Sequence, residues 1–285
     1  MTKHVGWNLP AERDIGQAPS EDLLARRSGA QAMLAGADLP DPVAVGGVPC
    51  VMCGPDDAAS TMLYLHGGGY RMGDPRLWLG LASRIAEVSG FRLVLPDYRL
   101  APEHPFPAAV LDAVAVYCAL LDEGSRGPVV GGDSAGGGLA AAVAVACTTS
   151  DMPMPASLVL LSPWLDLTAA GATYISNAEV DQFFSATAAA EAAEAYLRGY
   201  DPYDPLASPL RADLGDFPPV LILAGGSEVL LDDAVAFAGR LDTAGRSVRA
   251  HVVPEMQHVW PLMFPDLDES QAAISVIGAF LSAST

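Results

Sequence analysis

The sequence predicts an α/β fold in which a mostly parallel central sheet is covered by helices on both faces. From about residue 43 onward, short apolar runs that are typical of buried strands alternate with longer helical segments. This alternation is characteristic of parallel sheets, because each parallel crossover usually contains a helix. Hydrophobic residues make up 51% of the 285 residues and charged residues 17%, which is sufficient for a large core.

The expected elements are punctuated by glycine and proline, which are spread along the chain as turn residues. Ser20 is a candidate N-cap for the first helix, and Gly90 ends the second. Strands are expected at 43–53, 61–66, 91–95, 128–131, 158–161, 220–224 and 248–253, the last four as buried strands. Helices are expected at 21–35, 77–89, 108–121, 135–147, 231–243 and 270–281.

One long segment interrupts the alternation. Between residues 166 and 213 no buried strand appears, and the sequence is alanine-rich, with several aromatic residues. An insertion of this kind usually lies over the strand ends, where ligands bind. We therefore expect a helical cap at 166–212, joined by an N-terminal cap segment at 1–40. Residues 41–165 and 213–285 would form the catalytic α/β domain.

The chain is strongly acidic, with 34 acidic and 15 basic residues and a net charge of −19. Such a surface repels phosphate backbones and anionic membranes, so nucleic acid is not an expected partner. The first seven residues contain no apolar core of a signal peptide, and the longest apolar run, near 139–147, is far below the roughly 20 residues of a membrane span. We expect a soluble, cytoplasmic protein.

Two of the four cysteines, Cys50 and Cys53, form a C-x-x-C pattern that could indicate redox or zinc chemistry. They lie in an expected strand, where positions three apart point to opposite faces. A second pair or a nearby histidine that could complete a metal site is missing from the sequence. Cys118 and Cys147 lie in apolar helical stretches. We therefore expect all four to be structural, and no metal site.

The segment Gly132-Asp-Ser-Ala-Gly136 fits the pattern G-x-S-x-G between a buried strand and a helix. In this setting the serine lies on a strained turn that exposes its hydroxyl at a helix N-terminus, and the flanking glycines leave room for the backbone. Ser134 is therefore the candidate nucleophile. The alternatives are a glycine-rich turn with a helix-capping serine, or a phosphate-binding loop, which would require a lysine that is missing here.

A second glycine-rich segment, His66-Gly-Gly-Gly69, follows the strand at 61–66. A hydroxyl that attacks a carbonyl creates an oxyanion, which requires N–H donors already aimed at it. Loops of this type supply such donors in lipases and esterases. We expect the amides of Gly67, Gly68 and Ala135 to form this oxyanion hole, and His66 to shape the loop.

With these segments in view, the sequence resembles the hormone-sensitive-lipase-like family of α/β-hydrolases. The resemblance runs from about residue 60 to the C-terminus and rests on His66-Gly-Gly-Gly-Tyr70, Gly132-Asp-Ser-Ala-Gly-Gly137, and the segments at 96–108 and 162–167. It implies an α/β-hydrolase fold, a carboxylesterase that acts on short-chain esters, and no metal or organic cofactor. It is also compatible with a homodimer formed through an edge strand.

The general base should be a histidine late in the chain, because α/β-hydrolases place their catalytic groups in the order serine, acid, histidine. Of the five histidines, His4, His66 and His104 come too early, and His251 lies within an expected apolar strand. His258 follows the last expected strand, where the family has its histidine. We therefore predict that His258 is the base.

The acid should follow a strand and precede His258. The family usually has Asp-x-Leu-x-Asp there, and this sequence has Glu228-Val-Leu-Leu-Asp232. Alignment on Leu230 places Glu228 at the acid position, although it departs from the commoner aspartate. A glutamate can orient and stabilise an imidazole in the same way. Asp232 is the competing candidate, and with Asp233 it is expected to interact with a helix dipole.

The predicted mechanism is two-step acyl transfer through an acyl-enzyme. One alternative is a related hydrolase that acts on an amide, lactone or carbamate, including a deacetylase. The other is a non-catalytic receptor on the same fold, as in the plant gibberellin receptors, which lack the catalytic histidine that is present here. The residues expected to line the substrate pocket are Tyr70, Asp133, Trp164, Phe183 and Phe184.

Overall fold

The computed structural model describes residues 9–124, 127–150 and 152–283. The core of the fold is an eight-stranded sheet in the order β1-β2-β4-β3-β5-β6-β7-β8. β1 and β2 pair antiparallel with each other, and β2 pairs antiparallel with β4, whereas the pairs from β4 onward are parallel. The strand bounds are β1 Val43–Val45, β2 Val48–Cys53, β3 Thr61–Leu65, β4 Arg92–Pro96, β5 Val129–Asp133, β6 Leu158–Leu161, β7 Val220–Gly225 and β8 Val248–Val253.

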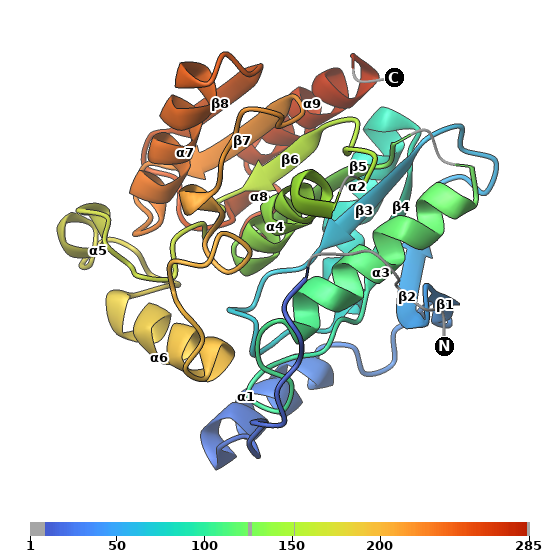
Figure 1. Ribbon diagram of the computed structural model, residues 1–285. Coiled ribbons are helices and arrows are strands. Elements are labelled where there is room, and N and C mark those ends of the chain that lie inside the picture. Colours follow the sequence, from blue (N-terminus) through green and yellow to red (C-terminus); the bar gives the residue numbers. More distant parts are fainter. Residues whose placement is uncertain (1–8, 125–126, 151, 284–285) are drawn as a thin grey trace.

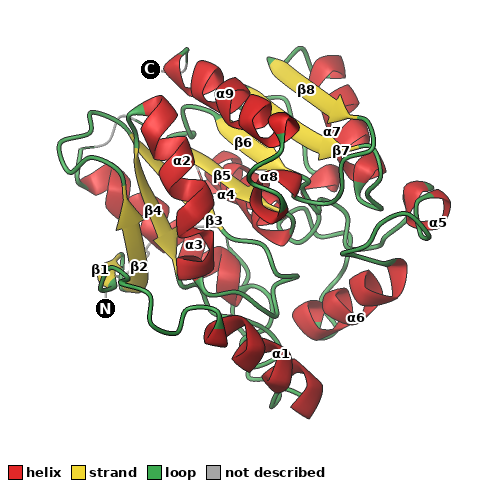
Figure 2. Cartoon of the chain, turned by 180° about the vertical axis from the view of Figure 1, so that it is seen from behind, coloured by secondary structure: helices red, strands yellow, loops and turns green. Residues whose placement is uncertain are grey.

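The prediction of a mostly parallel sheet with helices on both faces is confirmed (Figures 1 and 2). α2 (Leu79–Ser89), preceded by the short helix η1 (Pro75–Trp78), and α9 (Asp268–Ser282) pack on one face in one apolar cluster. α3 (Ala108–Asp122), α4 (Ala135–Ser150) and α7 (Leu231–Thr243) pack on the other face in a second cluster. Both faces of the central strands are therefore buried, which explains their continuous apolar sequence.

Two strand predictions were wrong in detail. The run at 43–53 is a hairpin, because Gly46 and Gly47 have φ values of 59° and 85° and form the tight turn between β1 and β2. The strand β8, predicted to be buried, lies at the edge of the sheet and is mostly exposed. His251, expected to be a structural histidine in an apolar strand, is exposed on β8.

The C-x-x-C cysteines lie on opposite faces of β2, as their spacing predicts. Cys50 packs in the cluster of α3 and α4, and Cys53 packs against the cluster of α2 and α9. Both are free thiols. Burial raises the pKa of Cys50 to about 12, so its thiol stays protonated.

The segments expected to form the cap lie at the end of the molecule towards which the parallel strands run (Figure 1). They contain α1 (Glu21–Ala32), whose N-cap is Ser20 as predicted, and the insertion helices α5 (Thr173–Ser176), α6 (Ala186–Leu197) and η2 (Pro209–Arg211). The Tyr200 hydroxyl donates to Ala11 O at 2.8 Å, so the N-terminal segment contacts the insertion. The first eight residues of the expected N-terminal segment, with the histidine at position 4, lie outside the described residues.

Within the described ranges, no helix combines the length and the apolar character that crossing a membrane requires. α4, the longest of them at 16 residues, is apolar on all sides because it is buried between the sheet, α3 and the insertion. It is a core helix of the α/β domain.

Candidate active site

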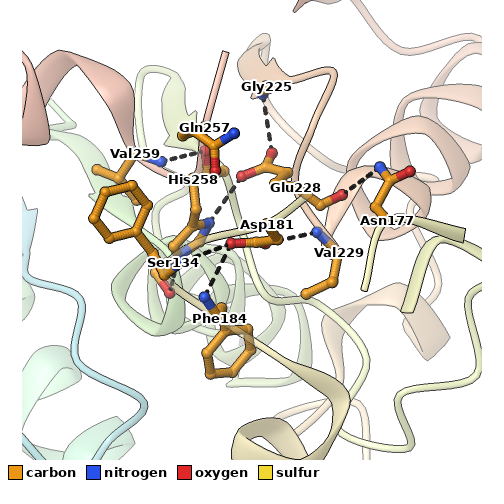
Figure 3. A network of polar contacts seen from close by, with 12 residues as sticks. Ser134, Asn177, Asp181, Phe184, Gly225, Glu228, Val229, Gln257, His258 and Val259 are labelled. Atoms are coloured by element: carbon orange, nitrogen blue, oxygen red, sulfur yellow. Dashed lines mark hydrogen bonds and ion pairs between the residues drawn. The ribbon is translucent and has the colours of Figure 1, made fainter. Parts of the chain in front are cut away.

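The parallel strands deliver three polar side chains to one edge of the sheet (Figure 3). Ser134 directly follows β5, Glu228 follows β7, and His258 follows β8. Because the carboxyl ends of parallel strands meet at one edge, residues 124 positions apart in the chain come into contact.

The turn at Ser134 has the backbone strain that its motif predicts. Ser134 has a φ of 53°, in the left-handed region that residues with a side chain rarely adopt. A Cβ at Gly132 would lie 2.4 Å from Gly136 O, and a Cβ at Gly136 would lie 2.0 Å from Leu65 O. Neither position can therefore hold a larger residue. The turn presents the Ser134 hydroxyl at the start of α4, where the helix dipole favours negative charge.

The imidazole of His258 links the serine to a carboxylate. Its Nδ1 lies 2.8 Å from Glu228 Oε2, and its Nε2 lies 2.9 Å from Ser134 Oγ. An ionised carboxylate can only accept, so Nδ1 holds the proton and Nε2 can accept from the hydroxyl. All three side chains are buried, with 8% of His258, 7% of Ser134 and none of Glu228 exposed.

The two candidate acids have different surroundings. Glu228 Oε1 accepts from the Gly225 amide at 3.0 Å, and its other oxygen faces His258. Asp232, in the first turn of α7, instead accepts from the Thr173 amide at 3.1 Å. The geometry therefore brings Glu228 to the histidine, and Asp232 to the cap insertion.

The pKa of His258 is raised. Burial alone would lower it, but the hydrogen bond and the negative charge of Glu228, with smaller contributions from Asp181 and Asp133, outweigh the burial. A carboxylate beside an imidazole stabilises the imidazolium in this way. The arrangement therefore strengthens His258 as a proton acceptor.

The predicted assignment of Gly67 to the oxyanion hole was wrong. Its amide already donates to Asp133 Oδ1 at 3.1 Å, so it cannot turn to a ligand. Gly68 and Gly69 both face the pocket beside Ser134. In the part of the chain that the structure describes, the amides of Gly68, Gly69 and Ala135 donate to no protein acceptor. Gly69 therefore replaces Gly67 in the candidate set.

Asp133 has a structural position that its motif did not reveal. Its Oδ1 accepts from the Tyr64 hydroxyl and from the Gly67 amide, both at 3.1 Å, so it ties the glycine loop to β3 and β5. Burial raises the pKa of Asp133 to about 7, although these hydrogen bonds lower it. The residue was predicted to line the substrate pocket, and it does so beneath the loop.

His66 has the loop-shaping position that was expected of it. Its ring stacks on Tyr98 with the ring centroids 4.2 Å apart, and its Nδ1 lies 2.7 Å from Gly67 O. Burial lowers its pKa to about 4, so it is neutral at ordinary pH. A Cβ at Gly73 would lie 2.2 Å from the His66 ring, which explains the glycine that closes this loop.

A pocket of about 270 Å³ opens above these groups. Its floor contains Ser134 and His258. Its cap wall, a name used here for Phe183, Phe184, Ala188 and Ala192, comes from the insertion. Phe184 stacks on the His258 ring with the centroids 5.9 Å apart.

The pocket prediction was wrong for two of its five residues. Tyr70 and Trp164 are buried behind the lining, 2% and 0% exposed. Tyr70 stacks on Tyr196 of α6 with the centroids 3.9 Å apart, and Trp164 packs edge-on against Phe184. Both aromatic residues support the wall and lie outside the lining.

Sequence reasoning assigned no role to three polar residues that fix the site, of which Asp181 and Asn177 are labelled in Figure 3. Asp181 accepts from the amides of Phe184 and Val229 at 2.9 and 2.8 Å, and so joins the cap to the turn that holds the acid. Asn177 donates to the Glu228 carbonyl at 2.9 Å. Ser162 accepts from the Val259 amide at 3.0 Å, next to the histidine. Ser162 begins the segment 162–167 on which the family resemblance partly rests, but no role was predicted for it, and Asn177 and Asp181 lie in the insertion, outside the quoted motifs.

The arrangement contains the parts that acyl transfer requires. A hydroxyl is hydrogen-bonded to an imidazole, the imidazole is oriented by a carboxylate, and backbone amides without a protein acceptor among the described residues face the same pocket.

Comparison with known proteins agrees with this chemistry. The α/β hydrolase fold family matches residues 62–262. An acetyl-hydrolase of Streptomyces hygroscopicus is 44% identical over 227 residues, which cover 79% of this chain and 76% of the relative. An esterase of Acinetobacter venetianus is 31% identical over 78% of this chain and 75% of the relative.

The solved structures that resemble this chain are also esterases and lipases. The crystal structure of an esterase from the bacterial hormone-sensitive lipase family has a TM-score of 0.87 and 41% identity, and the match covers 94% of this chain and 93% of that one. A hormone-sensitive lipase from a metagenome library has a TM-score of 0.88 and 38% identity over the same shares. The chain therefore belongs to the bacterial hormone-sensitive lipase family of α/β-hydrolases, and it is a carboxylic-ester hydrolase.

Proposed function

We propose that this enzyme hydrolyses esters of short-chain carboxylic acids, with Ser134 as nucleophile, His258 as general base and acid, and Glu228 as the group that orients the imidazole. The observation that carries the proposal is the continuous hydrogen-bond chain from Ser134 Oγ through His258 to Glu228, with distances of 2.9 and 2.8 Å. Such a chain activates an otherwise weakly nucleophilic hydroxyl.

In the first step, the Ser134 hydroxyl proton moves to His258 Nε2 as Oγ forms a bond to the ester carbonyl carbon. The amides of Gly68, Gly69 and Ala135 stabilise the oxyanion. The carbon–oxygen bond to the alcohol then breaks, and the alcohol leaves with the proton from His258. Water repeats the sequence on the acyl-enzyme, with His258 taking its proton, and releases the acid and free Ser134.

Two observations support a short acyl group. The pocket volume of about 270 Å³ is just below the roughly 300–1,000 Å³ of sites for drug-sized ligands. The relative from Streptomyces hygroscopicus is named an acetyl-hydrolase. The preferred acyl group is therefore as small as acetyl, and the remaining space holds the alcohol part of the substrate.

The nucleophile is tested by Ser134→Ala with 4-nitrophenyl acetate. We expect kcat to fall by at least about 10⁴-fold, because the group that forms the covalent bond is lost. The circular dichroism spectrum and the melting temperature should be retained. Activity within a factor of ten of the wild type would contradict the assignment.

The acyl preference is tested with 4-nitrophenyl esters from acetate to laurate. We expect kcat/KM to be highest among the short acyl chains and to fall for chains that exceed the pocket. A maximum at long chains, or efficient turnover of long-chain triacylglycerols, would contradict the preference.

A further inference from the structure

Two arginine residues line the candidate catalytic pocket. Arg71 lies two residues after Gly69, and Arg26 comes from α1. The protein has only 15 basic residues and a net charge of −19, so two cations at one pocket contrast with the rest of its surface. The acidic lining of this pocket is the buried Asp133, which lies beneath the glycine loop.

A third arginine holds these two in place. Arg27, the neighbour of Arg26, donates through Nε to Arg71 O at 2.8 Å and through Nη2 to Ala101 O at 2.9 Å, and it is paired with Glu103. Arg27 therefore attaches α1 to the loop that contains Arg71. Since adjacent residues of a helix point in different directions, this attachment leaves Arg26 to face the pocket.

The two pocket arginines are only weakly neutralised by the protein. Arg71 lies 4.0 Å from Glu191, beyond hydrogen-bond distance, and 64% of the Glu191 side chain is exposed. An ion pair of this kind contributes little. Three carboxylates, Asp22, Glu191 and Glu194, line a neighbouring cleft that shares Arg26 and Arg71 with the catalytic pocket. Within the described ranges, Arg26 forms no ion pair.

We propose that Arg71 and Arg26 bind a carboxylate on the substrate, so that the enzyme prefers small esters with an anionic group away from the scissile bond. A guanidinium matches a carboxylate in geometry and charge. The inference rests on the proposed function, because the anion must be bound while Ser134 attacks. The anionic group takes no part in the reaction and leaves unchanged on one of the products.

The test compares substrates that differ only in charge. 4-Acetoxybenzoate and 4-acetoxybenzamide share the acetyl group and the ring, and place the anion on the alcohol side. Mono(4-nitrophenyl) succinate and 4-nitrophenyl butyrate share a four-carbon acyl chain, and place it on the acyl side. Each kcat/KM is divided by the rate of alkaline hydrolysis of the same ester. A preference for the anionic member in one pair identifies the side that holds the carboxylate.

The variants are Arg71→Gln, Arg26→Gln and the double variant, with Arg249→Gln as the matched control. Arg249 lies on exposed β8 and its loss changes the net charge by the same amount as each single substitution. We expect the double variant to lower the ratio of anionic to neutral kcat/KM about tenfold, through KM, because a charge-assisted hydrogen bond is lost. Glu191→Gln should raise the ratio slightly, because it removes a negative charge near Arg71 that repels an anionic substrate. The control should leave it unchanged.

A ratio that does not change in Arg71→Gln, Arg26→Gln and the double variant, for both substrate pairs, would overturn the inference. Competitive inhibition provides a second readout that needs no turnover of the anionic ester: benzoate should inhibit more strongly than benzamide, and only in enzymes that keep the arginines. The Ser134→Ala variant distinguishes a failure of the anion-binding proposal from a failure of the proposed catalytic function. Persistent hydrolysis of the neutral esters in that variant would contradict the proposed function, whereas an unchanged ratio with Ser134-dependent hydrolysis contradicts only the anion site.

Discussion

The floor of the pocket and its cap wall are built in different ways. The floor residues Ser134 and His258, with Glu228 behind them, lie in the turns that follow three strands, are at most 8% exposed, and are joined by hydrogen bonds at 2.8–2.9 Å. On the cap wall, Phe183 is 40% exposed and packs against Phe264, with the ring centroids 5.8 Å apart. Chemistry that tolerates little displacement is thus placed on rigid strand ends, and substrate contacts are placed on an insertion.

This contrast predicts that changes on the floor reduce kcat, whereas changes on the wall alter KM. Polar and aromatic contacts connect the two regions. Asp181 and Asn177 on the cap side hydrogen-bond to the backbone around Glu228, and Phe184 stacks on the His258 ring. Substitutions on the floor, in the residues that support it and on the cap wall can therefore test whether kcat and KM respond separately.

The largest effect is expected on the floor, for Glu228→Gln. Glutamine keeps the size of the side chain but removes the charge and can hold the imidazole in the wrong tautomer, so kcat should fall by about 10³- to 10⁴-fold. Asp232→Asn is the matched control, because Asp232 bonds to the Thr173 amide and does not contact the histidine. We expect this control to lose less than about tenfold. A larger loss in Asp232→Asn would transfer the acid role to Asp232.

A smaller effect is expected for Asp133→Ala, which removes the acceptor of the Gly67 amide. The glycine loop should then shift relative to Ser134, and kcat should fall by up to about 10²-fold, which is comparable to the loss of one oxyanion donor. Tyr64→Phe deletes one of the two donors to Asp133 and should have a milder effect in the same direction. Retention of kcat within twofold in Asp133→Ala, with a normal melting temperature, would contradict this positioning role.

On the wall, Phe184→Ala should raise KM for 4-nitrophenyl butyrate about fivefold and leave kcat within about twofold, because about 1 kcal/mol of apolar contact is lost. Ile175→Ala is the control, since Ile175 belongs to the same insertion but is 84% exposed and lies outside the pocket lining. If Phe184→Ala instead left KM unchanged and lowered kcat about as much as Asp133→Ala, Phe184 would belong with the floor.

The pH dependence provides the most subtle test of the floor. The neutral form of His258 accepts the proton, so kcat/KM should fall as the pH decreases through its pKa, which is raised above the usual 6.5. In Glu228→Gln the charge that favours the imidazolium is lost, and the acid limb should move to lower pH. The measurement is kcat/KM for an activated ester between about pH 4 and pH 9 in both enzymes. If the acid limb of the kcat/KM profile lies at the same pH in both enzymes, Glu228 does not raise the pKa of His258.

The floor could be predicted from the sequence because its residues sit in local patterns that fix both backbone and chemistry. The G-x-S-x-G turn requires glycine at 132 and 136 for steric reasons, and the structure gives those reasons directly. For Glu228 and His258, their places after successive strands put them at the same edge of the sheet, and the family resemblance distinguished them from the other candidate acids and histidines. The fold class could also be predicted from local patterns, because apolar residues recur with a different spacing in strands and in helices, and this spacing shows that the two alternate along the chain.

The parts that could not be predicted depend on contacts between distant segments. Gly67 resembles Gly68 and Gly69 in sequence, and only its bond to Asp133 sets it apart. Tyr70 was placed in the pocket because it follows the glycines, but Tyr196 of α6 covers it. Arg26 lines the pocket from α1, a helix whose Arg27 bonds to Arg71 O, 44 positions away in the chain. The exposure of β8 follows from its place in the strand order, which no local pattern reveals.

The central claim is that Ser134 forms the covalent bond to the substrate. It is tested most directly by treating the enzyme with diethyl 4-nitrophenyl phosphate, which transfers its phosphoryl group to an activated serine, and then measuring intact mass and mapping the modified peptide. We expect one adduct per chain, located on Ser134, with complete loss of esterase activity and with no adduct in Ser134→Ala. An adduct at another residue would contradict the claim. So would residual esterase activity in Ser134→Ala that the reagent abolishes as fast as it abolishes the activity of the wild type.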